Sequence, residues 1–337
     1  MRRQLLVLMG LLPLIFVAAA ATFVALWPAL RTFDQSRLRG ALTLSSADEL
    51  ALKVDYVDAL PGTRIALLGD SFVFGGAMAD IVSGDWRVHT LDRYLESCLR
   101  ERTGQPVSVI NFGQDGFLPL DMAAVVSRLQ ARGVEYFVMN LNSRSMSNDF
   151  NVPSARYSRP WMREAAGSGL ISATYAKLSL YRRMRFNETP ADWGKRHARA
   201  IERVFVGSER QTSTMATDFR TLLKLKARYR TATFDPERSV QARALLDLLS
   251  DAHVYAFATV ENTSLGVAIM SVAKRNQLAS EMTSLVAAAG AGQRMLPSPA
   301  NLTDEDFVDY LHVTPSGSRK YAETLCAALV SRPLAVH

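Results

Sequence analysis

From Thr63 onward, short apolar runs alternate with amphipathic stretches, and this alternation is the feature that most constrains the fold. The runs "RIALLGD", "VSVINFG" and "EYFVMNLN" predict buried strands, whereas "WRVHTLDRYLESCLRERTG" and "LDMAAVVSRLQARG" between them have the periodicity of helices. Alternating strands and helices are typical of a parallel sheet that is covered by helices on both faces. The pattern resumes at "HVYAFATVEN" and closes with "DYLHVTPSGSRKYAETLCAALV". The sequence therefore predicts an α/β domain over residues 63–337.

The N-terminus predicts a membrane anchor over residues 1–31. No charged residue lies between Arg3 and Arg31, and at about 1.5 Å per residue a helix of that length exceeds the roughly 30 Å of a bilayer core. The arginines before it place the N-terminus in the cytoplasm and the domain outside the inner membrane, in the periplasm. A cleaved signal peptide, suggested by "VAAAAT", and a buried core helix are the alternatives. Residues 32–62 are interpreted as a juxtamembrane spacer.

Residues 149–250 interrupt the α/β pattern with helical segments, so we interpret them as a basic helical insertion. Residues 156–230 contain 17 Lys or Arg and 6 Asp or Glu, a balance of +11 against +7 for the whole chain. The excess charge is compatible with a solvated helical face, or with a surface that meets anionic lipid or a polyanionic glycan. Nucleic acid is the least favoured partner, because the domain is expected outside the cytoplasm.

The two cysteines and five histidines show no metal-binding spacing. Cys98 and Cys326 are interpreted as two separate buried thiols, with a disulfide in an oxidising compartment as the alternative. We expect neither a metal nor a cofactor.

Two separated motifs carry residues suited to acyl transfer. Ser71 follows Gly69 and Asp70 at the end of the first predicted strand, where ligands bind in sheets of this kind. By itself this motif more often marks a helix cap than a nucleophile. Near the C-terminus, Asp309 precedes His312 by three residues, a spacing that lets a carboxylate orient an imidazole. Together the three side chains form a candidate nucleophile, base and orienting acid.

These motifs resemble the SGNH, or GDSL, family of serine esterases and acyltransferases. The matching stretches, in the order of the family, are "GDSFVFG", "VINFGQDGF", "FVMNLNSRS" and "DYLHVTPSG", which together span most of the predicted domain. The resemblance implies a flavodoxin-like three-layer α/β/α fold and a Ser71–His312–Asp309 triad. It also implies an oxyanion hole made by the amides of Ser71 and Gly113 and by an asparagine side chain.

The third stretch departs from the family pattern, which ends this strand with Gly-x-Asn. On "MNLNSRS" that pattern places Asn142 at the glycine and Arg144 at the asparagine. We favour Asn142 as the third oxyanion donor, with Asn140 or a site remodelled around Ser143 and Arg144 as alternatives. A missing donor can lower turnover roughly 10²–10³-fold.

The anchor, the insertion and this departure resemble membrane-tethered members of the family that act in alginate O-acetylation and in D-alanyl transfer to teichoic acid. The resemblance implies an O-acyltransferase or esterase that uses an acyl donor and an envelope glycan, beside a multipass membrane O-acyltransferase. Its alternative is a non-catalytic protein that binds glycan or scaffolds such a complex.

Overall fold

The computed structural model describes residues 53–147, 232–248, 253–288 and 294–332, together with Ala18, Leu50, Leu223 and residues 225–227, 229 and 230. The chain divides into two units, Met1–Leu38 and Arg39–His337. The predicted membrane anchor and most of the predicted insertion lie outside the described residues. Among the helices that are described, none has the length and apolar character needed to cross a bilayer.

Four parallel strands form the sheet, in the order β2-β1-β3-β4. In register, Ile65 of β1 lies beside Val109 of β2 and Tyr136 of β3. Every residue of β2 and β3 is buried, as expected of strands covered on both faces. The predicted parallel α/β sheet is confirmed; its strands are β1 (Thr63–Leu68), β2 (Val107–Asn111), β3 (Tyr136–Leu141) and β4 (His253–Ala258).

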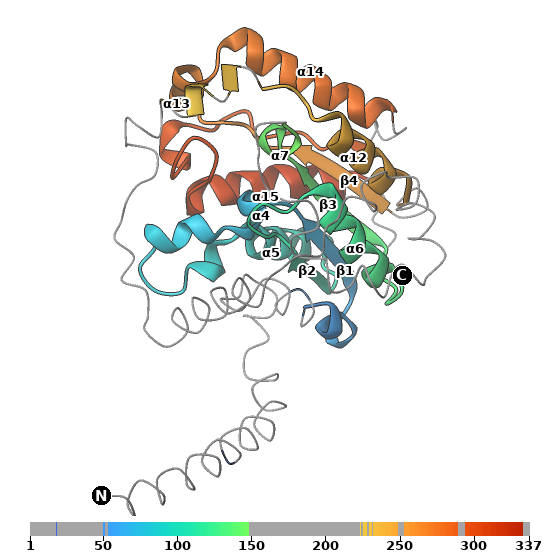
Figure 1. Ribbon diagram of the computed structural model, residues 1–337. Helices are drawn as coiled ribbons and strands as arrows, with labels where there is room; N and C mark the ends of the chain where they lie inside the picture. Colours follow the sequence, from blue (N-terminus) through green and yellow to red (C-terminus); the bar gives the residue numbers. More distant parts are fainter. Residues whose placement is uncertain are drawn as a thin grey trace, which may run out of the picture. The chain divides into compact units, whose positions relative to one another are not determined.

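Helices cover both faces of the sheet (Figure 1). Alternate residues of β1 enter different cores: Ala66 and Leu68 pack with α6 (Pro119–Gln130), α12 and α14, whereas Ile65 and Leu67 pack with α5 and α15. The domain thus has three layers. The other helices are α4 (Ser71–Phe74), α5 (Leu91–Thr103), α7 (Ser143–Met146), α12 (Pro236–Leu248), α13 (Thr263–Ile269), α14 (Val272–Ala288), α15 (Pro315–Val330), and the 3₁₀ turns η1 (Val57–Ala59), η2 (Gly76–Asp80), η3 (Trp86–His89) and η6 (Asp304–Asp306).

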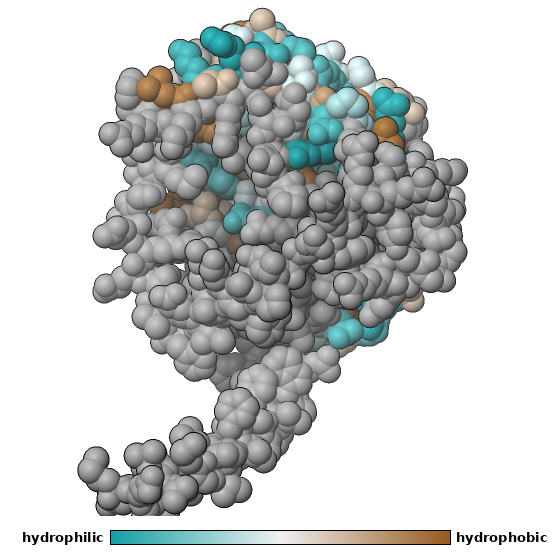
Figure 2. Space-filling model, in the orientation of Figure 1, coloured by the Kyte–Doolittle hydropathy of each residue, from teal (hydrophilic) through white to brown (hydrophobic). Residues whose placement is uncertain are grey.

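The outer side of α14 is solvated. Leu278, Met282 and Leu285 of this helix are buried in the domain. Figure 2 shows mostly hydrophilic residues over its outer surface. Val272, the first residue of the helix, is an exposed apolar residue. This pattern is that of an amphipathic helix on the outside of a layered domain.

Residues 53–60, which we had assigned to the spacer, belong to the folded domain. Val54 and Val57 are buried in the same core as α6. Lys53 is fully buried, and its Nζ donates a hydrogen bond of 2.6 Å to the carbonyl oxygen of Asn111 at the end of β2. The domain therefore begins before Thr63.

The predicted insertion is also shorter than 149–250. Its described C-terminal part forms α12, whose Ala242, Leu245 and Leu246 are buried against the sheet, so this helix is part of a layer of the domain. Just before α12, Phe234 forms an antiparallel bridge with Ser147. Ser147 and Phe234 therefore lie side by side, although they are far apart in sequence.

The prediction of two separate thiols was wrong, because Cys98 and Cys326 form a disulfide. Cys98 lies on α5 and Cys326 on α15, two helices that pack against each other on the same face of the sheet. Their Cα atoms are 6.2 Å apart, although 228 positions separate them in sequence. This proximity arises from the order of the layers, which no local sequence pattern reveals.

Candidate active site

Ser71 lies at the carboxyl end of β1, as the first residue of α4. Asp70 caps this short helix, since its Oδ1 accepts the N–H of Phe72 at 3.0 Å. A glycine is required at position 69, because a Cβ there would lie 2.3 Å from Val73 Cγ2 and 2.8 Å from Asn140 Cβ. The cap expected from the sequence is thus Asp70, which leaves the Ser71 hydroxyl for another role.

Asp309 and His312 lie in a tight hairpin. Phe307 and Val313 form an antiparallel bridge, and the Val308 N–H donates to the His312 carbonyl oxygen at 2.7 Å. Within the turn, Asp309 Oδ1 accepts the N–H groups of Leu311 at 2.8 Å and His312 at 2.7 Å. These bonds fix the carboxylate beside the imidazole.

The structure brings together the three side chains of the predicted triad. Asp309 Oδ2 lies 2.7 Å from His312 Nδ1, and His312 Nε2 lies 2.8 Å from Ser71 Oγ. The histidine and aspartate side chains are only 16% and 11% exposed, so their contact is largely shielded from water. With Nδ1 protonated toward the carboxylate, Nε2 is an acceptor for the serine proton.

Asp309 is ionised at neutral pH. Burial raises the pKa of this carboxyl. The hydrogen bond and the charge of His312, together with the two backbone N–H groups, lower the pKa by more than burial raises it, so that the net pKa lies below the ordinary 3.8. An ionised Asp309 can stabilise the imidazolium that forms when His312 accepts a proton.

The candidate oxyanion donors differ in their geometry. The Ser71 N–H is at the first position of α4, where a helix leaves its N–H groups without partners inside the helix. The Gly113 N–H, in contrast, donates to Asn111 Oδ1 at 2.8 Å. A Cβ at Gly113 would lie 2.3 Å from the Phe74 nitrogen, so this glycine lets its loop approach α4 closely. The geometry does not support the predicted donor role of the Gly113 amide.

The asparagines considered for the third donor lie at the end of β3. Asn140 is in the strand, and its Nδ2 donates to Thr259 Oγ1 at 2.7 Å. Asn142 is buried directly after the strand, and its carbonyl oxygen accepts the N–H of Met146, the last residue of α7. Arg144 lies in α7, but its side chain is outside the description. Asn142 thus shares the sheet edge with Ser71, and its role as donor stays a prediction.

Comparison with known proteins assigns no family. No protein-family profile and no curated protein sequence matches the chain. Among solved structures, a lipase/acylhydrolase from Enterococcus faecalis is 12% identical with a TM-score of 0.43, over 80% of this chain and 96% of that one. A carbohydrate acetylesterase family member from Sinorhizobium meliloti is 13% identical with a TM-score of 0.38, over 80% of this chain and 98% of that one. An inhibitor-bound aryl esterase from M. smegmatis is 12% identical with a TM-score of 0.39, over 80% of this chain and 99% of that one. The functional argument therefore rests on the site.

Sequence reasoning missed the residues that hold Asp70. The hydroxyl of Ser145 on α7 donates a short hydrogen bond to Asp70 Oδ2. Arg238 of α12 is buried, and its Nη1 donates to the carbonyl oxygens of Ser145 at 3.0 Å and Ser147 at 2.6 Å. The turn that carries Ser71 is thereby connected through Ser145 to Arg238 of α12. "SRS" after the third strand was the only local signal of this contact.

Within the described ranges, no three His, Cys, Asp or Glu side chains gather in a way that could hold a metal ion.

Proposed function

We propose that this protein is a serine acyl-ester enzyme that works through an acyl-enzyme on Ser71. The observation that carries the proposal is the continuous contact from Ser71 Oγ through His312 to Asp309, with distances of 2.8 Å and 2.7 Å. A buried carboxylate, an oriented imidazole and a hydroxyl at the carboxyl end of a parallel strand are the parts that nucleophilic acyl transfer requires.

In the first half-reaction, His312 Nε2 takes the Ser71 proton while Oγ attacks the acyl carbonyl carbon. The oxyanion is held by the Ser71 N–H and, in our proposal, by the side chain of Asn142. Collapse of this intermediate breaks the acyl–oxygen bond, and the imidazolium returns its proton to the leaving alcohol. A second alcohol or water then attacks the acyl-enzyme by the same steps in reverse order, which gives ping-pong kinetics.

We propose that the acyl acceptor or donor is a cell-envelope polysaccharide and that the domain is tethered outside the inner membrane. The uncharged run between Arg3 and Arg31 supports the anchor. The Cys98–Cys326 disulfide supports an oxidising compartment, since such bonds are rare in the cytosol. The basic stretch 156–230 supports an anionic polymer or lipid surface beside the enzyme, and a multipass O-acyltransferase is the proposed membrane partner.

Esterase and O-acyltransferase share these residues and differ in the acceptor. The deciding experiment incubates the full-length protein in membranes with an activated acetyl ester, with and without envelope polysaccharide, and includes Ser71→Ala as the control. Acyl-glycan that forms only with intact Ser71 supports transfer. Ser71-dependent hydrolysis that no glycan alters supports an esterase and contradicts transfer.

The rival proposal is a glycan-binding or scaffolding protein with an idle triad. The bond from Gly113 N–H to Asn111 is the observation that favours it, because one expected oxyanion donor is engaged elsewhere. A folded protein that reacts with no activated ester or serine-directed reagent supports this rival.

A further inference from the structure

The hairpin that carries His312 is closed at its base by Asp306. The Thr314 N–H donates to the Asp306 carbonyl oxygen at 2.9 Å. These two residues directly flank the bridged pair Phe307 and Val313, on the side away from the turn. The positions of Asp309 and His312 therefore depend on how firmly this base is held. A displacement there moves the imidazole relative to Ser71, which belongs to a different part of the chain.

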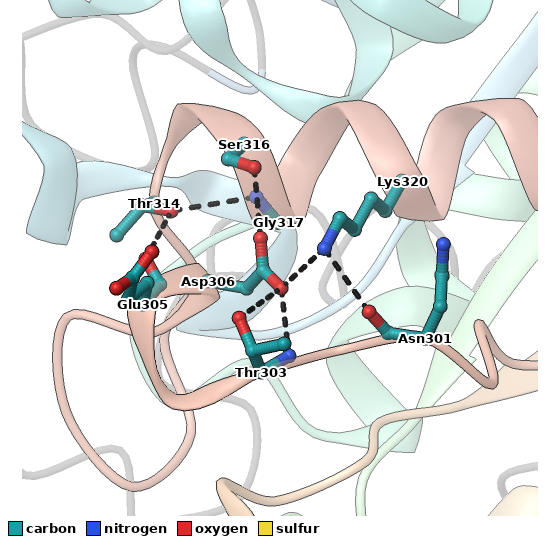
Figure 3. A network of polar contacts seen from close by, with 8 residues as sticks. All are labelled: Asn301, Thr303, Glu305, Asp306, Thr314, Ser316, Gly317 and Lys320. Carbon is teal, nitrogen blue, oxygen red and sulfur yellow. Dashed lines mark hydrogen bonds and ion pairs between the residues drawn. The ribbon is translucent and has the colours of Figure 1, made fainter.

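The side chain of Asp306 holds the base through both of its oxygens (Figure 3). Oδ2 accepts hydrogen bonds from the Thr303 N–H at 2.7 Å, the Thr303 hydroxyl at 3.1 Å and Lys320 Nζ at 2.7 Å. Oδ1 accepts the Ser316 hydroxyl at 2.8 Å. Asp306 is 2% exposed, so the carboxylate exchanges its water shell for these donors.

These donors lie on both sides of the hairpin in sequence. Thr303 precedes it, whereas Ser316 and Lys320 lie in the first turns of α15. Lys320 also donates to the Asn301 carbonyl oxygen at 3.0 Å. Gly317 permits the close contact between helix and hairpin, because a Cβ there would lie 2.3 Å from the Asp306 carbonyl oxygen. The carboxylate thus joins the hairpin to a long helix of the domain.

We propose that Asp306 is a positioning residue that holds His312 at hydrogen-bonding distance from Ser71. The inference rests on the proposed function and adds a residue outside the triad to it. Asp306 touches none of the reacting atoms and acts through the hairpin. The carboxylate is required, because an amide at this position carries no charge to pair with Lys320. Its NH₂ group would also face either the donors of Thr303 and Lys320 or Ser316, whose hydroxyl would then have to accept instead of donate.

Asp306 keeps this charge at neutral pH. Burial raises its pKa, but the hydrogen bond from Lys320 and those from Thr303 and Ser316 outweigh burial, and the net pKa lies below the ordinary 3.8. The charged carboxylate therefore holds the hairpin base at neutral pH.

The experiment compares Asp306→Asn with Glu305→Gln in the full-length protein. Glu305 is the matched control: it is exposed, carries the same charge, and contributes only its main-chain carbonyl to the network, toward Thr314. We expect Asp306→Asn to lower kcat for an activated acetyl ester about 10- to 100-fold with little change in KM, since small misplacements of catalytic groups reduce rates by such factors. We expect Glu305→Gln to behave as wild type.

A second readout follows the imidazole directly. We expect the proton between His312 Nδ1 and Asp309 to give a downfield NMR resonance in the resting protein. Asp306→Asn should weaken or shift this resonance, whereas Glu305→Gln should leave it in place. This measurement needs no turnover. It therefore tests Asp306 even if wild type fails to hydrolyse the ester, a result that would count against the proposed function alone.

If Asp306→Asn does not fold, Lys320→Met provides the test, because Lys320 is partly exposed and its loss leaves the other donors in place. We then expect a smaller loss of kcat and a smaller change in the same resonance. A folded variant at Asp306 or Lys320 whose kcat and resonance match those of Glu305→Gln would overturn the inference.

Discussion

His312 Nε2 lies 2.8 Å from Ser71 Oγ, although 241 positions separate the two residues in sequence. Ser71 is held by the end of β1 and the Asp70 cap, whereas His312 is held by the hairpin before α15. Their distance is therefore set by the packing of two independently braced elements.

Asp309→Asn is expected to lower kcat by about 10⁴, the magnitude that loss of the orienting carboxylate has in a serine triad. The amide can present a donor to His312 Nδ1, which favours the tautomer that cannot accept the Ser71 proton. KM is expected to change little. Steady-state kinetics on an activated acetyl ester measure this, with the exposed Asp304→Asn as the control. Equal kcat values for the two variants would contradict the role of Asp309.

Ser145→Ala is expected to lower both the free energy of unfolding and kcat, because it leaves the buried Asp70 Oδ2 without the hydroxyl that donates to it. Loss of one partner of a buried polar group costs about 1–3 kcal/mol. Ser143→Ala is the matched control on the same turn, since the Ser143 hydroxyl donates to Glu261 instead. Denaturant unfolding measures the free energy of unfolding, and ester kinetics measure kcat. Equal values for Ser145→Ala and Ser143→Ala would contradict the role of Ser145 in holding Asp70.

The stability of the domain is expected to fall as pH rises from about 4 to 6. Burial raises the pKa of Asp92 from 3.8 to about 6, only partly offset by hydrogen bonding to Asn111 and the charge of Lys53, so the folded state retains a proton that the unfolded state releases in this window. The loss is roughly 3 kcal/mol, obtained by converting this pKa difference. The pKa values of Asp306 and Asp309 are lowered, so these two groups act in the opposite sense. They stabilise the fold above pH 3.8, and this stabilisation is lost as the pH falls below that value.

Asp92→Asn tests this assignment. The free energy of unfolding of the variant is not expected to decline between pH 4 and 6. Relative to wild type, the variant therefore becomes more stable as the pH rises through this range. Exposed Glu101 on the same helix supplies the control variant, Glu101→Gln, which should keep the wild-type profile. Parallel profiles for Asp92→Asn and wild type would show that Asp92 does not titrate in this window.

Reduction of the Cys98–Cys326 bond is expected to lower the free energy of unfolding by roughly 2–4 kcal/mol, because the bond closes a loop of 228 positions. The chain contains only these two cysteines. Thiol titration in denaturant should therefore detect none before reduction and both after it. Two titratable thiols in protein isolated without reductant would contradict the disulfide.

The parts of the fold and site that were predictable have local signals. Gly69 and Asp70 interrupt an apolar run just before Ser71, and Asp309 and His312 have the spacing of a side-chain pair. Ser71 was expected at the carboxyl end of a parallel strand, where ligands bind, and the resemblance of the motifs to the SGNH family implied that Asp309 and His312 meet it there.

What the sequence left open depends on contacts between distant segments. Lys53 was expected in a polar spacer, but it is buried and its Nζ donates to the main-chain carbonyl oxygen of Asn111, the last residue of β2. The side chain of the same residue, Asn111, accepts the Gly113 N–H, which was expected to donate to the oxyanion. Similarly, Asp306 lies in an acidic run, "DED", and only the folded α15 shows that one of the three carboxylates is buried and paired.

The most direct test of the account is covalent labelling of Ser71. Full-length protein in membranes is treated with a fluorophosphonate, and the modified peptide is identified by mass spectrometry, with folded Ser71→Ala as the control. The account predicts a single adduct on Ser71 that disappears in the variant and forms more slowly in Asp309→Asn. A folded wild-type protein that acquires no adduct at Ser71, or labels equally in Ser71→Ala, would contradict it.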